Sequence, residues 1–180
     1  MPTFINEEDN QGSFEKHPVG MVQAVLVYVA DIGVQKGSYQ GSPKNRRKVV
    51  LFWETAEMQA DGKPFVLWKM YTASMGENAN LRADLMGWNG KDFTAEELKR
   101  FDVESFLGRN CLLNIVHTED GKYANITGIT PIMKNMPAIQ PVNKDLSDGL
   151  KKWLEKKRGE ALDAGANPAG NAADDSELPF

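Results

Sequence analysis

The stretch VGMVQAVLVYVADIGV, residues 19–34, decides the fold of this 180-residue chain. It is rich in β-branched and aromatic residues, which predicts one long β-strand. Gly33 near its end predicts a bend in that strand. The most apolar part, residues 19–29, is interrupted by Gln23 and is shorter than the roughly 20 apolar residues of a membrane-spanning helix. The pattern therefore indicates a sheet protein.

Two further strands are predicted downstream of this stretch. Residues 35–45 are turn-forming and predict a polar loop, after which residues 46–55 form a second strand. Asp61-Gly62-Lys63-Pro64 predicts a turn, and residues 65–74 form a third strand. Because the connections are short, the three strands are expected to pair as an antiparallel meander.

The pattern then changes to helix and back to strand. Residues 80–88 carry apolar side chains at helical spacing, and Thr94 with Glu97 three residues later predicts a capping box at the start of a second short helix. A fourth strand is predicted at 111–117 and a fifth at 123–132, joined by a hairpin turn at 119–122. Pro131, Pro137 and Pro141 mark the end of the sheet. A charged helix follows at 146–162 and is interrupted by Gly159.

Three strands, a helical insert and two strands give the connectivity of a five-stranded Greek-key barrel, the OB-fold. A split α+β sheet has the same element order and is the alternative. The predicted class is mainly β, and four segments are expected along the chain. These are a mobile acidic arm at 1–16, the OB-fold domain at 17–143, the charged helix at 144–162 and a disordered acidic tail at 163–180.

The charges are segregated along the chain. All 21 Lys and Arg residues lie within residues 16–158, together with 16 of the 25 acidic residues, so this part carries a net charge of +5. A basic body with acidic ends is typical of proteins that bind a polyanion, although a mixed-charge surface with acidic termini is the simpler interpretation. The single cysteine, Cys111, cannot form an internal disulfide and fits a reducing cytoplasm.

Enzymatic chemistry finds little support in the sequence. His17 and His117 are the only histidines, and neither stands at a metal-ligand spacing from Cys111. No glycine-rich phosphate-binding loop is present, and the aspartates fall in turns or helix caps. We therefore expect no catalytic residues, no metal and no cofactor.

Basic and aromatic residues on neighbouring predicted elements form a candidate nucleic-acid interface, because single-strand binding needs cations for phosphates and flat rings for bases. Lys69 and Tyr71 share one face of the third strand, and Phe52 and Trp53 lie on opposite faces of the second, so one of those two rings is expected to point outward. For each aromatic residue the alternative is core packing, and for the basic run at 46–48 it is a solvated strand start. The candidates are Tyr39, Lys44, Arg46, Arg47, Lys48, Trp53, Lys69, Tyr71, Lys122 and Tyr123.

The charged helix adds five further cations. It carries Lys151, Lys152, Lys156, Lys157 and Arg158. These residues form a solvated face on a helix held by Leu150, Trp153 and Leu154, or they supply extra phosphate contacts or a docking site for the acidic tail.

The last seven residues, DDSELPF at 174–180, join three acidic side chains to a short apolar tip. Residues 165–173 before them hold no large apolar residue and predict a flexible linker. We interpret the tip as a partner-binding hook in which Phe180 fills a pocket on another protein and basic residues there hold the acids. The residues concerned are Asp174, Asp175, Glu177, Leu178, Pro179 and Phe180. An ordinary acidic terminus is the alternative.

This ending resembles the C-terminal tip of bacterial and phage single-stranded DNA-binding proteins, which have acids, a small apolar residue and then Pro-Phe. The body resembles a phage-encoded family of such proteins over roughly residues 17–135, through segments such as VVLFWE at 49–54, KMYTAS at 69–74 and GRNCLL at 108–113.

The resemblance implies an OB-fold that coats single-stranded DNA during phage DNA replication, recombination and repair in the host cytoplasm. It also implies a tail that recruits replication and repair enzymes. A homo-oligomer or a cooperative filament on DNA is compatible with this role. An OB-fold adaptor that binds another protein and a recombination strand-annealing protein are the alternatives.

Overall fold

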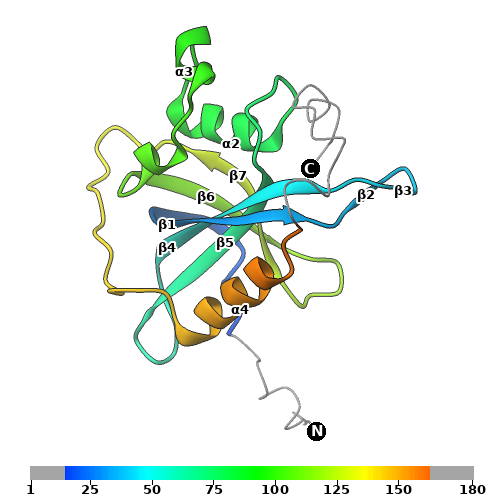
Figure 1. Ribbon diagram of the computed structural model, residues 1–180. Helices are drawn as coiled ribbons and strands as arrows, with labels where there is room; N and C mark the ends of the chain where they lie inside the picture. Colours follow the sequence, from blue (N-terminus) through cyan, green and yellow to red (C-terminus); the bar gives the residue numbers. More distant parts are fainter. Residues whose placement is uncertain (1–14, 163–180) are drawn as a thin grey trace, which may run out of the picture.

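A five-stranded antiparallel sheet of order β5-β4-β1-β6-β7 forms the centre of the protein (Figure 1). The structure, a computed structural model, describes residues 15–162. The long strands are β1 (Gly20–Gln35), β4 (Arg46–Met58), β5 (Pro64–Thr72), β6 (Asn110–His117) and β7 (Ala124–Thr130). The helices are α2 (Asn80–Asn89), α3 (Ala95–Lys99), α4 (Asp148–Gly159) and the 3-10 helix η1 (Val103–Phe106). The prediction of a mainly β protein is confirmed.

The first three long strands form the predicted meander, since β1 pairs with β4 and β4 pairs with β5. β1 is long enough to serve two neighbours: residues 24–35 pair with β4, and residues 20–25 pair with β6 on the other side. The ladder between β1 and β4 shifts register between Leu26 and Tyr28 and again between Asp31 and Gly33. Gly33 has a φ of 72°, so the predicted bend lies where a left-handed residue is needed.

The sheet buries apolar side chains on both faces. β4 sends Val49, Leu51 and Trp53 to one core cluster, which also contains residues of α2, and sends Val50 and Phe52 to a second cluster beneath α4. We call the α2 side the inner face and the α4 side the outer face. A strand covered on both sides is a continuous apolar run rather than an alternating one, and residues 49–53 of β4 are such a run.

The helical insert joins the two edge strands of the sheet. α2 contacts both β5 and β7, and a Cβ on Gly87 would come within 2.9 Å of the carbonyl oxygen of Ile129 in β7. The indole Nε1 of Trp88 donates to the carbonyl oxygen of Asn110, 2.8 Å away. The predicted capping box of Thr94 and Glu97 is confirmed at the start of α3. The sheet itself is open between β5 and β7, so it is not a closed barrel.

A strap, which we define as residues 137–146, crosses from β7 to α4 and is tied down by a buried acid. Both carboxylate oxygens of Glu54 accept hydrogen bonds from the strap, one from the backbone N–H of Val142 at 2.5 Å and the other from the backbone and side-chain N–H groups of Asn143 at 2.9 Å. Three donors on one carboxylate offset the cost of burying its charge. The strap therefore holds the start of α4 against the outer face.

α4 is shorter than the helix predicted at 146–162. Ser147 caps its start by accepting from the N–H of Leu150, and the helix ends at Gly159, where the sequence predicted an interruption. Beyond it, the N–H of Leu162 donates to the carbonyl oxygen of Val34 at 2.8 Å. Residue 162 is therefore joined to the end of β1.

The polar loop predicted at 35–45 contains a small hairpin of β2 (Ser38–Tyr39) and β3 (Ser42–Pro43). Gln40 and Gly41 form its turn with φ values of 50° and 81°, and two consecutive left-handed residues are the signature of a tight hairpin turn. The sequence predicted the polar loop but not the hairpin within it, because single-residue turn propensities do not reveal two-residue strands.

Residues 1–14 of the acidic arm expected at 1–16, and the whole acidic tail expected at 163–180, lie outside the described residues. The last two residues of the expected arm are hydrogen-bonded to the domain, since Glu15 accepts from the backbone N–H of Ala60 and Lys16 donates to the carbonyl oxygen of Gly121. Among residues 15–162, no helix is both long and apolar enough to cross a membrane.

Candidate nucleic-acid interface

Two basic segments more than a hundred residues apart meet at Asp31 in β1. The guanidinium of Arg47, at the start of β4, forms an ion pair with the Asp31 carboxylate, and Nε of Arg158 in α4 donates to the Asp31 carbonyl oxygen at 3.1 Å. The Arg47 guanidinium holds the pKa of Asp31 below its ordinary value. The side-chain amide of Gln35 also donates to the carbonyl oxygen of Lys157 at 2.8 Å. The structure therefore combines the predicted run at 46–48 with the cations of α4.

The hairpin next to this cluster carries two more of the predicted residues. Nζ of Lys44 lies 5.8 Å from the ring centroid of Tyr39. On the neighbouring part of β4, Nζ of Lys48 donates to Oγ1 of Thr72 at 2.8 Å. Burial and the nearby charge of Arg46 lower the pKa of Lys48. An anion beside Lys48 would be favourable, because it would offset both effects.

Lys69 and Tyr71 share one face of β5, as predicted, but that face is the inner one. Tyr71 is 2% exposed, and its hydroxyl donates to a carboxylate oxygen of Asp84 in α2 at 2.7 Å. Lys69 pairs with the same oxygen at 2.7 Å. Burial raises the pKa of Tyr71, and the charge of Asp84 raises it further. The predicted base-stacking role of Tyr71 was wrong, because this pair fastens α2 to the sheet.

Trp53 and Phe52 also differ from the prediction that one of them points outward. Trp53 is buried in the inner cluster and Phe52 in the outer one. The two residues do lie on opposite faces of β4, but α2 and α4 cover both faces. Arg46 is buried as well, so of the run at 46–48 only Arg47 is an exposed residue.

Sequence reasoning missed the aromatic pair that does reach the surface. Trp68 lies on the outer face of β5 and pairs in the ladder with the buried Phe52 of β4. It is 42% exposed, and its ring packs against that of Trp153 in α4 with centroids 4.6 Å apart and an interplanar angle of 35°. The sequence contained a signal for this pair, because the alternation of side chains along a strand places Trp68 on the other face of β5 from Lys69 and Tyr71. We call Trp68 and Trp153 the tryptophan platform.

Lys122 and Tyr123 are exposed in the turn between β6 and β7, with Tyr123 among the most exposed large apolar side chains of residues 15–162. The turn is tied to the start of the described chain, since Lys16 donates to the carbonyl oxygen of Gly121. At its base, His117 contacts the carbonyl oxygen of His17 at 2.7 Å. These two candidates therefore belong to a separate loop and do not extend the cluster at Asp31.

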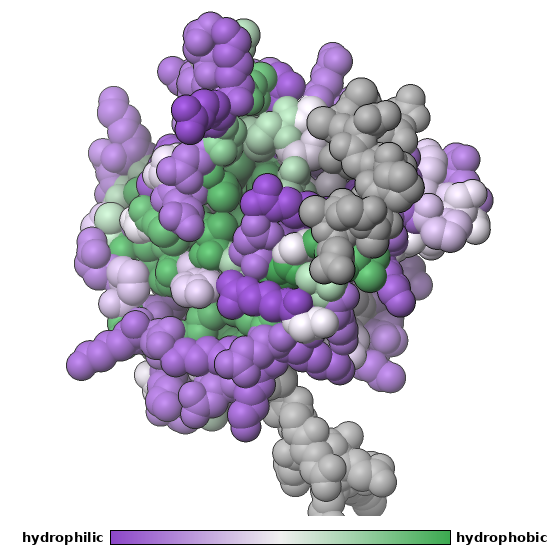
Figure 2. All heavy atoms as spheres, in the orientation of Figure 1, coloured by the Kyte–Doolittle hydropathy of each residue, from purple (hydrophilic) through white to green (hydrophobic). Residues whose placement is uncertain are grey.

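The solvent side of α4 is strongly polar. Lys151, Lys152, Lys156 and Arg158 are exposed, whereas Leu154 is buried. Two of its lysines have acidic neighbours: Lys151 pairs with Asp145 at 2.5 Å and Lys157 pairs with Glu160 at 3.2 Å. Figure 2 shows hydrophilic side chains along α4, with an apolar surface between α4 and the helical insert. The predicted solvated face and a phosphate-binding face are both compatible with this arrangement.

Within residues 15–162, no three His, Cys, Asp or Glu side chains gather in a way that could hold a metal ion. Cys111 is buried in the inner cluster, and burial raises the pKa of its thiol far above the ordinary value. His17 is buried with Nε2 at 3.2 Å from Oγ1 of Thr55, which makes it a satisfied core histidine.

No protein-family model matches this sequence, and no curated protein matches it. The function is therefore inferred from the residues and their geometry.

Proposed function

We propose that this protein binds single-stranded DNA on its outer side, where β5 meets α4, without chemical catalysis and without a cofactor. The observation that carries the proposal is the tryptophan platform, in which the 42% exposed ring of Trp68 packs at a tilt against that of Trp153. Aromatic rings that carry successive bases beside a cationic groove are the recurrent means of binding single strands with little sequence preference. Lys48 and the cations of α4 provide the charge beside the platform.

The strand order supports an OB-fold as the scaffold for this site. The order β5-β4-β1-β6-β7 is that of a five-stranded Greek-key barrel opened between its third and fifth strands, and α2 joins those two strands. In OB-folds, nucleic acid binds on the face of the second and third strands and at the loops after the first and fourth strands. Those positions correspond here to the platform, to the β2–β3 hairpin with Tyr39 and Lys44, and to the turn with Lys122 and Tyr123.

We further propose the role implied by the resemblance: coating of exposed strands during phage replication, recombination and repair in the host cytoplasm. Partner enzymes would be recruited through residues 174–180, which lie outside the described residues. Loss of partner capture from host lysate on removal of Phe180 alone would support that part, and unchanged capture would refute it.

The test of DNA binding is a titration of intrinsic fluorescence with oligo-dT and with duplex DNA of equal length. We expect tighter binding to the single strand than to the duplex. The fluorescence quenching should come from the platform tryptophans, because the other two tryptophans, Trp53 and Trp88, are buried. Repeating the titration at several salt concentrations should give a logarithmic slope of about −0.7 for each phosphate contact. Equal or tighter binding to the duplex would overturn the proposal.

A matched pair of lysine variants, Lys48 on the outer face of β4 and Lys69 on the inner face of β5, tests which face of the sheet meets the DNA. Lys48→Ala should weaken binding and flatten the salt slope by about 0.7, because one phosphate contact is lost. Lys69→Ala should leave the slope unchanged, because Lys69 is engaged with Asp84. The slopes are measured on variants that keep the wild-type circular dichroism spectrum. A flattened slope for Lys69→Ala with an unchanged slope for Lys48→Ala would place the DNA elsewhere.

A further inference from the structure

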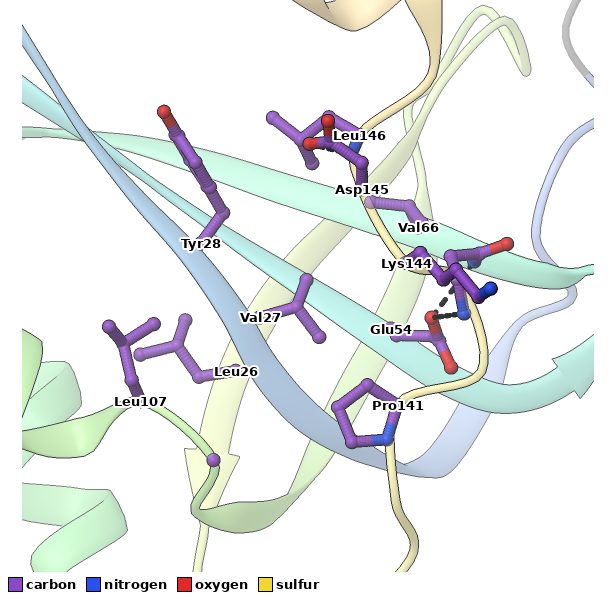
Figure 3. Close-up of a pocket in the computed structure, with 12 residues that line it drawn as sticks. Leu26, Val27, Tyr28, Glu54, Val66, Leu107, Pro141, Lys144, Asp145 and Leu146 are labelled. Carbon is purple, nitrogen blue, oxygen red and sulfur yellow. Dashed lines mark hydrogen bonds between the residues drawn. The ribbon is translucent and has the colours of Figure 1, made fainter.

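A cavity of about 290 Å³ lies between the outer face of β1 and the strap. Figure 3 shows Tyr28 and Leu107 on one side of it and Glu54, Pro141 and Lys144 on the other. Most of its lining is apolar, contributed by β1, β5, the turn at 107–108 and the strap. At this volume, below the roughly 300–1,000 Å³ of pockets for drug-sized ligands, the cavity suits a single planar group.

The chemistry of the wall favours an aromatic, negatively charged ligand. Tyr28 is 36% exposed and is held edge-on against Phe52, with ring centroids 6.0 Å apart. Both acidic residues of the lining are engaged, Glu54 by neutral N–H donors of the strap and Asp145 by the cation of Lys151. The exposed Lys144 supplies a cation at the rim. A flat apolar wall with a cation beside it matches a nucleobase and its phosphate.

The cavity is continuous with the proposed DNA-binding face. Val66 lines the cavity and stands two residues before Trp68 on the same face of β5, a separation of about 7 Å along a strand. Leu146, which also lines the cavity, belongs to the outer cluster that includes Trp153. A DNA strand with one base on the tryptophan platform therefore passes close to the mouth of the cavity.

We propose that this cavity is a base-binding subsite that takes one unstacked base of the same DNA strand. Tyr28 provides the stacking ring, Leu107 and Pro141 enclose the base, and Lys144 contacts the adjoining phosphate. This inference rests on the proposed binding of single-stranded DNA and extends the interface from the platform to the strap.

The experiment is ultraviolet crosslinking of the full chain to oligo-dT, followed by identification of the modified peptides. We expect a thymidine adduct on Tyr28 in addition to adducts on the platform. Tyr28→Leu, which keeps apolar packing against Phe52, should weaken oligo-dT binding by about 5- to 150-fold, the range for loss of one stacked base.

A second arm of the test uses exposed lysines. Lys144→Ala should flatten the salt slope by about 0.7, whereas the matched control Lys99→Ala should leave it unchanged. Lys99 lies in α3, on the opposite side of the sheet from α4 (Figure 1), and its pair with Glu96 is exposed.

The outcomes separate the two proposals. Adducts confined to Trp68 and Trp153, with Lys144→Ala indistinguishable from Lys99→Ala, would overturn the subsite and leave the proposed function standing. Absence of oligo-dT binding by the unaltered protein would overturn the function and the subsite together. The affinity of free thymidine nucleotide is compared with the affinity of oligo-dT per nucleotide. If the free nucleotide binds more tightly, the subsite as proposed is overturned, because the cavity would then be a site for a free nucleotide.

Discussion

Replacement of Tyr71 by Ala is expected to lower the free energy of unfolding by about 3–5 kcal/mol, the usual cost of removing a buried aromatic ring. Tyr71 is nearly fully buried in the inner cluster. Its loss also removes the hydroxyl donor to Asp84 and so weakens the link between β5 and α2. Urea denaturation followed by circular dichroism measures the change.

Tyr71→Phe is the matched control for that experiment. It keeps the ring and removes only the hydroxyl, which should cost about 1–3 kcal/mol because one acceptor position of Asp84 is left unfilled. Its affinity for oligo-dT should equal that of the unaltered protein. A Tyr71→Phe variant of full stability that binds oligo-dT weakly would contradict the assignment of this ring to the core.

The second large effect is expected on DNA binding. Trp68→Ala should weaken binding of oligo-dT by about 1–3 kcal/mol, which is the contribution of one aromatic–base stack. It should also remove most of the fluorescence quenching, since Trp68 is the more exposed ring of the platform. The fold should persist, because β5 keeps its ladder with β4 and its inner-face contacts with α2.

Two variants serve as controls for Trp68→Ala. Trp68→Phe retains a ring and should recover part of the affinity, whereas Met58→Ala removes a half-exposed apolar side chain from β4 and should have no effect on binding. If Trp68→Ala and Met58→Ala bind oligo-dT equally well, the tryptophan platform is not the binding surface.

The period of side chains along β5 predicts which residues share a face of the strand, but not which face is exposed. The alternation of Lys69 and Tyr71 with Trp68 and Met70 follows from strand geometry, so the sequence shows which of these side chains share a face. It does not show which face meets solvent, because helices cover both. The inner-face residues looked like a binding pair because a cation and an aromatic ring lie together, and that same pairing is what fastens a helix to a strand.

The sequence by itself determined the local elements: the long strands, the turns between them, the capping box of α3 and the break in helix at Gly159. These features depend on side-chain period, backbone preference and hydrogen bonds between near neighbours, all of which residues a few positions apart decide.

Only the tertiary structure decided which side chains are available for binding. The meeting of Arg47 with Arg158 at Asp31, the packing of Trp68 against Trp153 and the cavity beside Tyr28 each join residues from distant parts of the chain. Such contacts depend on how α4 crosses the outer face. That crossing is set by the buried acid Glu54 and by the packing of the outer cluster, which no local pattern encodes.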